Sequence, residues 1–395
     1  MVKKDILDYD KPIPVILGGF VNGYGLVRSF SKKKIPCICL DFEKNLALYS
    51  KHSKGIICPN PSTNDFIDFL MNLGEKLRSK GVFYATYDNW LIPICKNRDR
   101  LEKFFIFPMS DWETINKCVN KTELYKIAEK NEIKIPKTFF LNNIDEIQNI
   151  ENQLVYPCVI KPYNPTFFKH SKIGKNVLFI TSKEKLDYWV NEIKKIKLGN
   201  IALVVQEFIK GDIENLYTLT SYSNKNFEIV AYSIGHKIRQ YPPDNGTIIS
   251  GKLEDVPVLF ESCKKLVKIL GFYGISNIEF KKGENGEFYL MEINPRPGKW
   301  TYSSTAAGLN IPYISYAEIL GEEFKGVEKT KKELVWITLL DDLYFSIFEY
   351  KNQGYKDAHI SFFKWIRSIK GKKIFGIYSL SDPLPGIMYT WRKIS

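Results

Sequence analysis

The sequence of 395 residues lacks any apolar run long enough to cross a membrane, and it lacks a regular arrangement of cysteines. A membrane-spanning helix needs about 18 or more consecutive apolar residues. The seven cysteines are scattered, and only Cys37 and Cys39 lie close together, without a zinc-binding spacing. We therefore expect reduced thiols in a cytoplasmic protein that has neither a secretion signal nor a membrane span.

The sequence also lacks a recognisable nucleic-acid-binding module, although its formal net charge is +13. Its lysines are spread along the chain, and a basic protein equally attracts phosphorylated small molecules. A composition of 44% hydrophobic and 26% charged residues is that of a soluble globular protein. We expect small-molecule partners and no nucleic acid, and the sequence does not indicate an oligomeric state.

Residues 1–115 alternate between strand and helix patterns and are expected to form a doubly wound, Rossmann-like α/β domain. The stretch "PIPVILGGFVNGYGLVRSFSKKKIPCICLDF" predicts a strand at 15–17, a glycine-rich turn, a helix, and a strand at 35–40. The G-x-G-x-x-G spacing of dinucleotide sites is absent, so we assign the glycines to turn geometry, with a dinucleotide site at Asp41 as the alternative. Asp88 follows an apolar strand and is expected to cap the next helix, with a ligand crevice as the alternative.

A hairpin is predicted for "ISNIEFKKGENGEFYLMEINPRPGKW", because Asn285 and Gly286 form the strongest short signal for a two-residue turn. Counting back from this turn pairs Glu284 with Glu287 and places Glu279 opposite Glu292. Side chains alternate between the faces of a strand. The expected polar face carries Asn277, Glu279, Glu292, Asn294 and Arg296, and the expected apolar face carries Ile278, Phe280, Met291 and Ile293.

The opposed carboxylates of this hairpin call for a positive partner. Two like charges about 5 Å apart repel by roughly 3 kcal/mol at an effective dielectric constant near 20. Two carboxylates and an amide are hard oxygen ligands that suit Mg²⁺, which shares its ligand shell with water and substrate phosphates. The alternative is a solvent-facing hairpin that Lys281 and Arg296 neutralise.

Six motifs in one order give the middle of the chain a resemblance to the ATP-grasp superfamily of carboxylate-amine ligases. They are Lys121 on a helix, "PCVIKP" with Lys161, "VVQEFIKGDIE", "RQYPPDNG", "SNIEF" and "MEINPRPG". The resemblance covers about residues 116–325, and it is closest to the D-aspartate ligase group of envelope polymer synthesis. It implies an α/β chain with a Rossmann-like domain at 1–115, an α+β ATP-grasp domain at 116–325 with a subdomain at about 135–210, and a helical or irregular C-terminal segment at 326–395.

The resemblance also implies which residues bind ATP and metal. Lys121 and Lys161 would contact phosphates, and the hinge residues would hold adenine: Gln206, Glu207, Phe208 and Ile209. Asp212 or Glu214 would contact the ribose, and the sequence does not choose between them. Glu279, Glu292 and Asn294 would bind Mg²⁺, with Mn²⁺ as an alternative, and Arg239 and Arg296 would stabilise the transferred phosphoryl group. The segment at 163–176, which corresponds to a glycine-rich phosphate loop, holds only Gly174, so we expect side-chain charge to substitute.

The implied reaction is an ATP-dependent ligation through an acyl phosphate, for which the sequence needs neither a Ser-His-Asp set nor a nucleophilic cysteine. D-aspartate is one amino-acid substrate that the resemblance suggests. The alternative is a nucleotide-binding regulatory or scaffold protein without turnover. In the last segment Phe362, Trp365, Ile366 and Ile369 recur at helical spacing beside basic residues. We expect this stripe to pack on its own protein, with weak contact at a membrane surface as the alternative.

Overall fold

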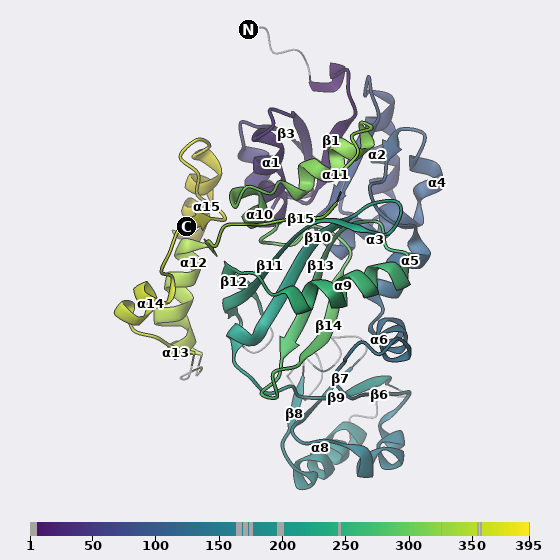
Figure 1. The fold of residues 1–395 in the computed structure, drawn as a ribbon, viewed down its shortest axis with the longest axis vertical. Helices are drawn as coiled ribbons and strands as arrows, with labels where there is room; N and C mark the ends of the chain where they lie inside the picture. The colour runs from purple at the N-terminus through teal and green to yellow at the C-terminus, as the bar shows by residue number, and fades with distance from the viewer. Residues whose placement is uncertain are drawn as a thin grey trace. The chain divides into compact units, whose positions relative to one another are not determined.

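The computed structural model describes residues 6–162, 168, 173, 177–195, 201–243, 246–324, 326–353, 355 and 358–394 (Figure 1). The chain divides into two compact units. The first comprises Met1–Asn120, Asp212–Glu279 and Glu292–Ser395, and the second comprises Lys121–Gly211 and Phe280–Met291. The domain boundaries predicted at 115 and 325 stay predictions, because they are defined by resemblance and not by compactness.

The N-terminal part of the first unit is a five-stranded parallel sheet in the order β3-β2-β1-β4-β5. Its strands are β1 (Ile13–Leu17), β2 (Cys37–Asp41), β3 (Ser53–Ile57), β4 (Gly81–Ala85) and β5 (Phe105–Ile106). The helices of this region are α1 (Val21–Ser31), α2 (Asp65–Glu75), α3 (Asp88–Lys96), α4 (Arg98–Leu101) and α5 (Trp112–Val119), with short 3₁₀ turns η1 (Ile6–Asp8) and η2 (Leu46–Tyr49). Every residue of β1, β2 and β4 is buried. The doubly wound α/β architecture is confirmed.

The glycines after β1 serve the turn into α1. Gly18 has a φ of +90°, a backbone conformation that residues other than glycine rarely adopt. A Cβ atom at Gly23 would lie 2.0 Å from the Gly18 carbonyl oxygen. Asp41 accepts hydrogen bonds from the Gly19 amide at 2.6 Å and from Asn45 at 2.9 Å. The assignment to turn geometry holds for Gly18, whereas Gly23 and Gly25 lie inside α1, and Gly23 allows the close approach of the Gly18 carbonyl.

A larger mixed sheet follows, in the order β14-β13-β10-β11-β12-β16-β17, with β15 (Glu328–Lys329) beside β11. Its other strands are β10 (Leu216–Ser223), β11 (Ile229–Tyr241), β12 (Thr247–Leu253), β13 (Gly274–Lys282), β14 (Phe288–Asn294), β16 (Val335–Ile337) and β17 (Lys373–Phe375). The first unit further holds η5 (Ile213–Asn215), α9 (Pro257–Leu270), α10 (Tyr302–Ala306) and α11 (Ile311–Ile319). The C-terminal segment thus supplies three strands of this sheet, β15, β16 and β17, besides its helices.

The remaining C-terminal elements stand together at the left of Figure 1, in yellow and yellow-green. They are α12 (Leu339–Tyr344), the π-helical turn η6 (Phe345–Glu349), α13 (Tyr350–Asn352), α14 (Phe362–Ser368) and α15 (Leu384–Ile394). Trp365 and Ile369 are buried in a small core with Ile238, Val335 and Ile337. Phe362 and Ile366 are exposed, so the predicted stripe packs on the protein along only half of its width.

The second unit is built on a four-stranded antiparallel sheet in the order β6-β9-β7-β8. Its strands are β6 (Thr138–Leu141), β7 (Cys158–Pro162), β8 (Leu178–Ile180) and β9 (Leu203–Glu207), and its helices are α6 (Lys121–Lys130) and α8 (Lys183–Lys195), with 3₁₀ turns η3 (Ile144–Asn149) and η4 (Glu151–Gln153). It has a core of its own, which includes Ile160, Leu178 and Val205. Among the described residues of both units, no helix is long and apolar enough to cross a membrane.

Candidate active site

The turn of the β13–β14 hairpin differs from its prediction. Gly286 takes a φ of +81°, whereas Asn285 is not among the residues with positive φ. The Gly283 amide donates to the Glu287 carbonyl at 2.8 Å, so the loop has three residues and the closing pair is Gly283 with Glu287. The predicted pair of Glu284 with Glu287 is wrong by one residue. The turn geometry therefore no longer predicts that Glu279 and Glu292 lie directly opposite each other. The repulsion that was estimated from this opposition no longer follows either.

Three side chains at the end of β14 form a chain of hydrogen bonds. The Asn294 amide donates to Glu292 Oε1 at 2.9 Å, and Asn294 Oδ1 accepts from Arg296 Nη2 at 2.9 Å. Glu292 and Asn294 are spaced by two residues along the strand and therefore lie on one face. The structure thus brings together three of the predicted site residues in the order in which the resemblance places them.

The other end of Arg296 is held by Asp88. Arg296 Nε donates to Asp88 Oδ1 at 2.6 Å, and Nη2 lies 3.3 Å from Oδ2. The N-cap of α3 is Tyr87, and Asp88 is the first helical residue, so the predicted capping role of Asp88 is wrong. Its carboxylate instead fixes the guanidinium in two places.

Glu279 is paired with a buried lysine. Lys237 Nζ lies 3.3 Å from Glu279 Oε2, and it also donates to Gln240 at 3.2 Å. On the neighbouring position of the same strand face, Asn277 accepts from Thr220 at 2.7 Å and donates to the Arg296 carbonyl at 2.6 Å. Asn277 therefore fixes the backbone that carries Arg296, and Lys237 supplies positive charge beside Glu279.

The donor set of Glu279, Glu292 and Asn294 fits a hard divalent cation in kind, because all three side chains offer oxygen. Within the described part of the chain, no three His, Cys, Asp or Glu side chains gather closely enough to hold a metal by themselves. The predicted set has two carboxylates and an amide, and an amide rotation would turn Asn294 Oδ1 from Arg296 toward Glu292. Their role as metal ligands stays a prediction.

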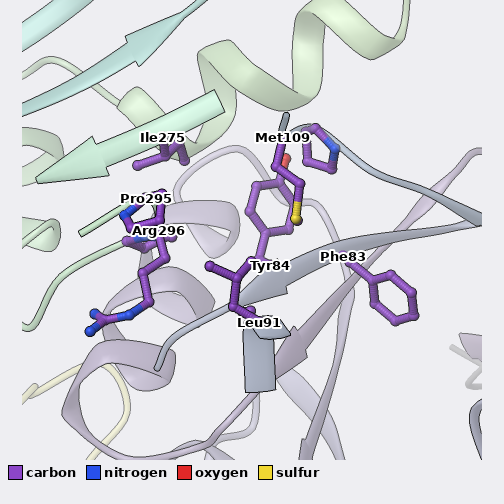
Figure 2. Close-up of a pocket in the computed structure, with 10 residues that line it drawn as sticks. Phe83, Tyr84, Leu91, Met109, Ile275, Pro295 and Arg296 are labelled. Carbon is purple, nitrogen blue, oxygen red and sulfur yellow. The ribbon is translucent and has the colours of Figure 1, made fainter. Parts of the chain in front are cut away.

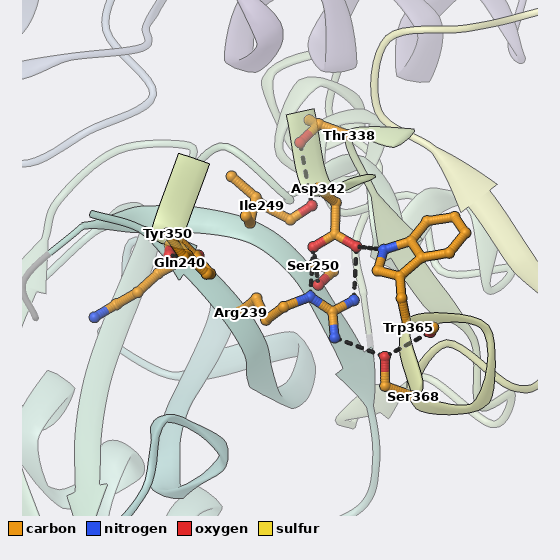
Figure 3. Close-up of polar contacts among 9 residues, drawn as sticks. All are labelled: Arg239, Gln240, Ile249, Ser250, Thr338, Asp342, Tyr350, Trp365 and Ser368. Carbon is orange, nitrogen blue, oxygen red and sulfur yellow. Dashed lines mark hydrogen bonds and ion pairs between the residues drawn. The ribbon is translucent and has the colours of Figure 1, made fainter. Parts of the chain in front are cut away.

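Arg239, the second predicted phosphoryl-binding arginine, lies in a buried network with the C-terminal segment (Figure 3). Its Nε and Nη2 donate to the two oxygens of Asp342 at 2.8 and 2.6 Å, and its Nη1 donates to Ser368 at 2.6 Å. Asp342 also accepts from Ser250 at 2.8 Å and from the Trp365 indole at 2.6 Å. All three nitrogens of the guanidinium have partners, so the structure fixes the position of Arg239, and its contact with phosphate stays a prediction.

In the second unit, two predicted ATP-binding residues contact each other. Lys161 Nζ donates to Gln206 Oε1 at 2.9 Å across β7 and β9, and Gln206 Nε2 donates to Thr138 at 2.8 Å. Antiparallel pairing sets Val159 beside Gln206, which places the two polar side chains on adjacent strands. The ammonium of Lys161 is therefore held at a defined position near the end of β7.

The predicted adenine-binding segment continues from β9 without regular structure. Glu207 pairs with the backbone of Lys137, and the Phe208 amide donates to the Pro157 carbonyl at 3.0 Å. Phe208 is exposed and packs edge-on against Phe179, while Ile209 is buried. Lys121 is exposed at the first position of α6. These contacts fix the segment and leave its affinity for adenine a prediction.

Asp212 precedes the turn η5 and Glu214 lies within it, and both are exposed. The structure does not favour one of them as the ribose ligand. The segment predicted to substitute for a glycine-rich loop, including Gly174, lies outside the described residues except for Phe168 and Ile173.

A small apolar pocket lies within the first unit beside Arg296 (Figure 2). It is lined by Phe83, Tyr84, Ala85, Leu91, Pro108, Met109, Ile275, Pro295, Arg296 and Pro297. It leaves only about 10 Å³ for the centre of a water molecule, which is the size of a single water site. In Figure 2 the Arg296 guanidinium points away from Met109 and Phe83. The pocket supports the backbone of Arg296 and is too small to bind a substrate.

Sequence reasoning missed the partners of the predicted residues: Asp342, Lys237 and the contact of Asp88 with Arg296. It also missed Lys299, which follows the "NPRPG" motif and donates to Thr247 at 3.5 Å. Burial lowers the pKa of Lys299 to about 8, against an opposing effect of Asp341. A lysine directly after the last motif was the only sequence signal for this group.

A family model described as ATP-grasp in the biosynthetic pathway with Ter operon matches residues 238–339, which include β12 to β16 and Arg239. Among curated proteins, the D-aspartate ligase of Enterococcus faecium is 22% identical over 354 residues, and the match covers 84% of this chain and 83% of that protein.

Solved structures share the fold. The N5-carboxyaminoimidazole synthetase of Staphylococcus aureus in complex with ADP gives a TM-score of 0.64 at 17% identity, with 87% of this chain and 86% of that chain covered. The L-amino acid ligase of Bacillus licheniformis gives a TM-score of 0.58 at 16% identity, with 79% and 75% covered. The similarity thus extends over most of the chain and is not limited to the central motifs.

Proposed function

Since this chain belongs to the ATP-grasp superfamily, we propose that it is a ligase that joins a carboxylate to an amine at the expense of ATP. The predicted resemblance and the enzyme class, an ATP-dependent ligase, are confirmed at the level of the family. The identities of the carboxylate and of the amine are part of the proposal. Similarity to a D-aspartate ligase supports an amino acid such as D-aspartate, added to a cell-envelope precursor in the cytoplasm.

The proposed reaction has two steps. A carboxylate oxygen of the first substrate attacks the γ-phosphorus of ATP, the bond to the β-γ bridging oxygen breaks, and ADP leaves. The amine nitrogen then attacks the acyl carbon, phosphate leaves with the carbon–oxygen bond pair, and the nitrogen loses a proton. No covalent bond to the protein forms, so the protein contributes position and charge.

Different residues of this chain would bind the phosphates, the transferred group and the metal. Lys161, oriented by Gln206, binds a phosphate as a point charge. Arg296, held at both ends by Asp88 and Asn294, presents a fixed guanidinium to the transferred group. Glu279, Glu292 and Asn294 would hold Mg²⁺, which when bound neutralises the phosphate oxygens.

One observation carries the proposal: the hydrogen-bonded chain Glu292–Asn294–Arg296–Asp88, which places a metal-type carboxylate next to a fixed guanidinium. A protein that only binds nucleotide has no need to fix an arginine for the transition state. Replacing Glu292 with Gln keeps the shape and removes the charge, so ADP release should fall about a hundredfold or more.

The test combines turnover with melting. Parent and Glu292→Gln are assayed for ADP release with a panel of amino acids and amine acceptors, and products are identified by mass. Glu287→Gln is the matched control, because Glu287 lies on the same hairpin and pairs with the exposed Lys134. An Mg·ATP-induced rise in melting temperature that is equal in parent and Glu292→Gln would overturn the metal assignment. Binding of Mg·ATP without turnover on any substrate pair would favour a regulatory nucleotide-binding protein.

A further inference from the structure

Helix α14 presents an apolar surface to solvent. Phe363 is 75% exposed, and Phe362 and Ile366 are each about half exposed. We call these three residues the α14 patch. Phe362 and Phe363 are ring neighbours, with centroids 6.2 Å apart, and Phe362 stacks on the buried Trp365 at 5.9 Å. The patch is therefore continuous with the core below it.

Helix α15 presents a second apolar surface of the same kind. Leu384, Ile387 and Trp391 are exposed, and Trp391 reaches 68%. Their spacing of three and then four residues puts them along one side of the helix. We call these three residues the α15 face. Isolated exposed apolar side chains are ordinary, whereas a group of three such side chains on one helix indicates an interaction surface.

Both helices are fixed from beneath, so these surfaces do not result from loose packing. On α14 the Trp365 indole donates to Asp342 at 2.6 Å, and Ile369 is buried. On α15 the Tyr389 hydroxyl contacts both oxygens of Asp341, at 2.7 and 2.6 Å. Because the inner sides are bound to the protein, the outer sides are set toward solvent.

The charge around these surfaces selects their partner. Residues 359–395 contain seven basic residues and one acidic residue: Lys364, Arg367, Lys370, Lys372, Lys373, Arg392, Lys393 and Asp382. The acidic one, Asp382, is buried and accepts from Ser50. The five basic residues from Lys364 to Lys373 are all exposed. A second copy of the chain would bring like charges together, whereas an anionic lipid surface offers both negative charge and an apolar interior.

We propose that the C-terminal segment docks on an anionic lipid bilayer through the α14 patch, and that the α15 face gives it a second apolar contact. The aromatic and aliphatic side chains enter the interface between headgroups and acyl chains, and the neighbouring lysines and arginines bind the lipid phosphates. The docking is peripheral and reversible, because the apolar groups are few and no anchor is involved. It would place the ligase beside lipid-linked acceptors, but the binding itself does not depend on turnover.

The test is sedimentation of the full chain with vesicles. One set contains phosphatidylcholine alone, and the other contains phosphatidylcholine and phosphatidylglycerol in about a two-to-one ratio. We expect binding to the anionic set only, and weaker binding at high salt. Phe363→Ser with Ile366→Ser should lower the partition constant about tenfold or more, since two apolar side chains no longer leave water.

Matched variants distinguish binding through this surface from non-specific binding of the protein to vesicles. Val258→Ser on α9 removes a side chain that is 57% exposed elsewhere in the first unit, and it should leave binding unchanged. Lys364→Gln with Arg367→Gln should weaken binding about tenfold or more, and Lys331→Gln with Lys332→Gln should weaken it less. Circular dichroism melting checks that each variant is folded.

Two results would overturn the proposal. One is a chain that stays in the supernatant with anionic vesicles at low salt. The other is a dimer that forms with rising protein concentration and that Phe363→Ser with Ile366→Ser abolishes, while the same substitutions leave vesicle binding unchanged. In that case the surface would bind a second copy of the chain.

Discussion

The two large sheets of the first unit differ in what they bury. The N-terminal parallel sheet buries almost only apolar residues, and its one buried acid, Asp41, stands at the end of β2 and closes a turn. The mixed sheet buries Lys237, Arg239 and Asn277 within its strands. Burying a charge costs several kcal/mol unless it is paired. The first sheet is thus explained by packing alone, and the second is not.

Two of the buried charges of the mixed sheet, Lys237 and Arg239, have partners of opposite sign, and Lys281 in β13 donates to the Gly211 carbonyl at 2.6 Å. Lys237 pairs with Glu279, and Arg239 pairs with Asp342. Apolar residues of similar volume at such positions often give equal or greater stability, so ion pairs of this kind are poor evidence of stabilisation. Their presence in a sheet that also carries the predicted metal ligands therefore supports a functional role for this sheet.

The sharpest way to break this comparison is to remove one partner of the most buried pair. Asp342→Ala leaves the Arg239 guanidinium buried without its counter-ion, and should lower the free energy of unfolding by about 3–5 kcal/mol. Chemical denaturation of parent and variant measures it. Ser250→Ala, which removes a neutral donor to the same carboxylate, should cost only about 1 kcal/mol.

A double substitution distinguishes pairing from packing. If Arg239→Met restores much of the stability lost in Asp342→Ala, the cost came from the unpaired charge. Equal losses in the single and the double variant would contradict that reading and would show that Asp342 acts mainly by holding Trp365.

Lys161 extends the comparison to the second unit, where this lysine lies near the end of β7 and donates to Gln206 Oε1 at 2.9 Å. Lys161→Ala should lower ATP affinity about tenfold or more, because a phosphate contact held by Gln206 is lost. Calorimetric titration with Mg·ATP measures it, and Lys183→Ala on the exposed face of α8 is the control. An affinity within about twofold of the parent would remove Lys161 from the ATP site.

At buried apolar positions we expect equal losses of stability in the two large sheets. Ile16 in β1 and Ile234 in β11 are both fully buried. Ile16→Val and Ile234→Val should each cost about 0.5–1.5 kcal/mol in urea unfolding, since each removes one methyl group from a packed core. A much larger loss at Ile234 would show that the mixed sheet is sensitive throughout and not only at its charges.

The sequence predicted those parts of the fold whose signals are local. Continuous apolar strands separated by glycine turns indicated the parallel sheet, and the Asn285-Gly286 pair indicated the hairpin. The predicted two-residue turn was wrong because Gly286 alone takes the left-handed conformation, and the loop has three residues.

What could not be predicted depends on distance along the chain. Asp342 lies 103 residues from Arg239, and Arg296 lies 208 residues from Asp88. No pattern in one sequence shows such pairings, because they arise only when separate elements pack. The strands β16 and β17 have three residues each, which is too short for an alternation to appear.

The smallest expected effect concerns Lys299, whose pKa burial lowers to about 8. In the unfolded chain this group keeps its proton up to about pH 10.4. The unfolded state therefore binds more protons than the folded state between pH 8 and pH 10.4, so the free energy of unfolding rises with pH over this range. The loss of stability caused by a charged, buried Lys299 is complete below pH 8 and disappears as the pH approaches 10.4. Lys299→Met should raise the melting temperature at pH 7 by about 2 °C, discounted for a half-buried group. Melting curves at pH 7 and pH 10 measure the difference, and a gain that grows with pH would mean that the folded protein favours the charged form.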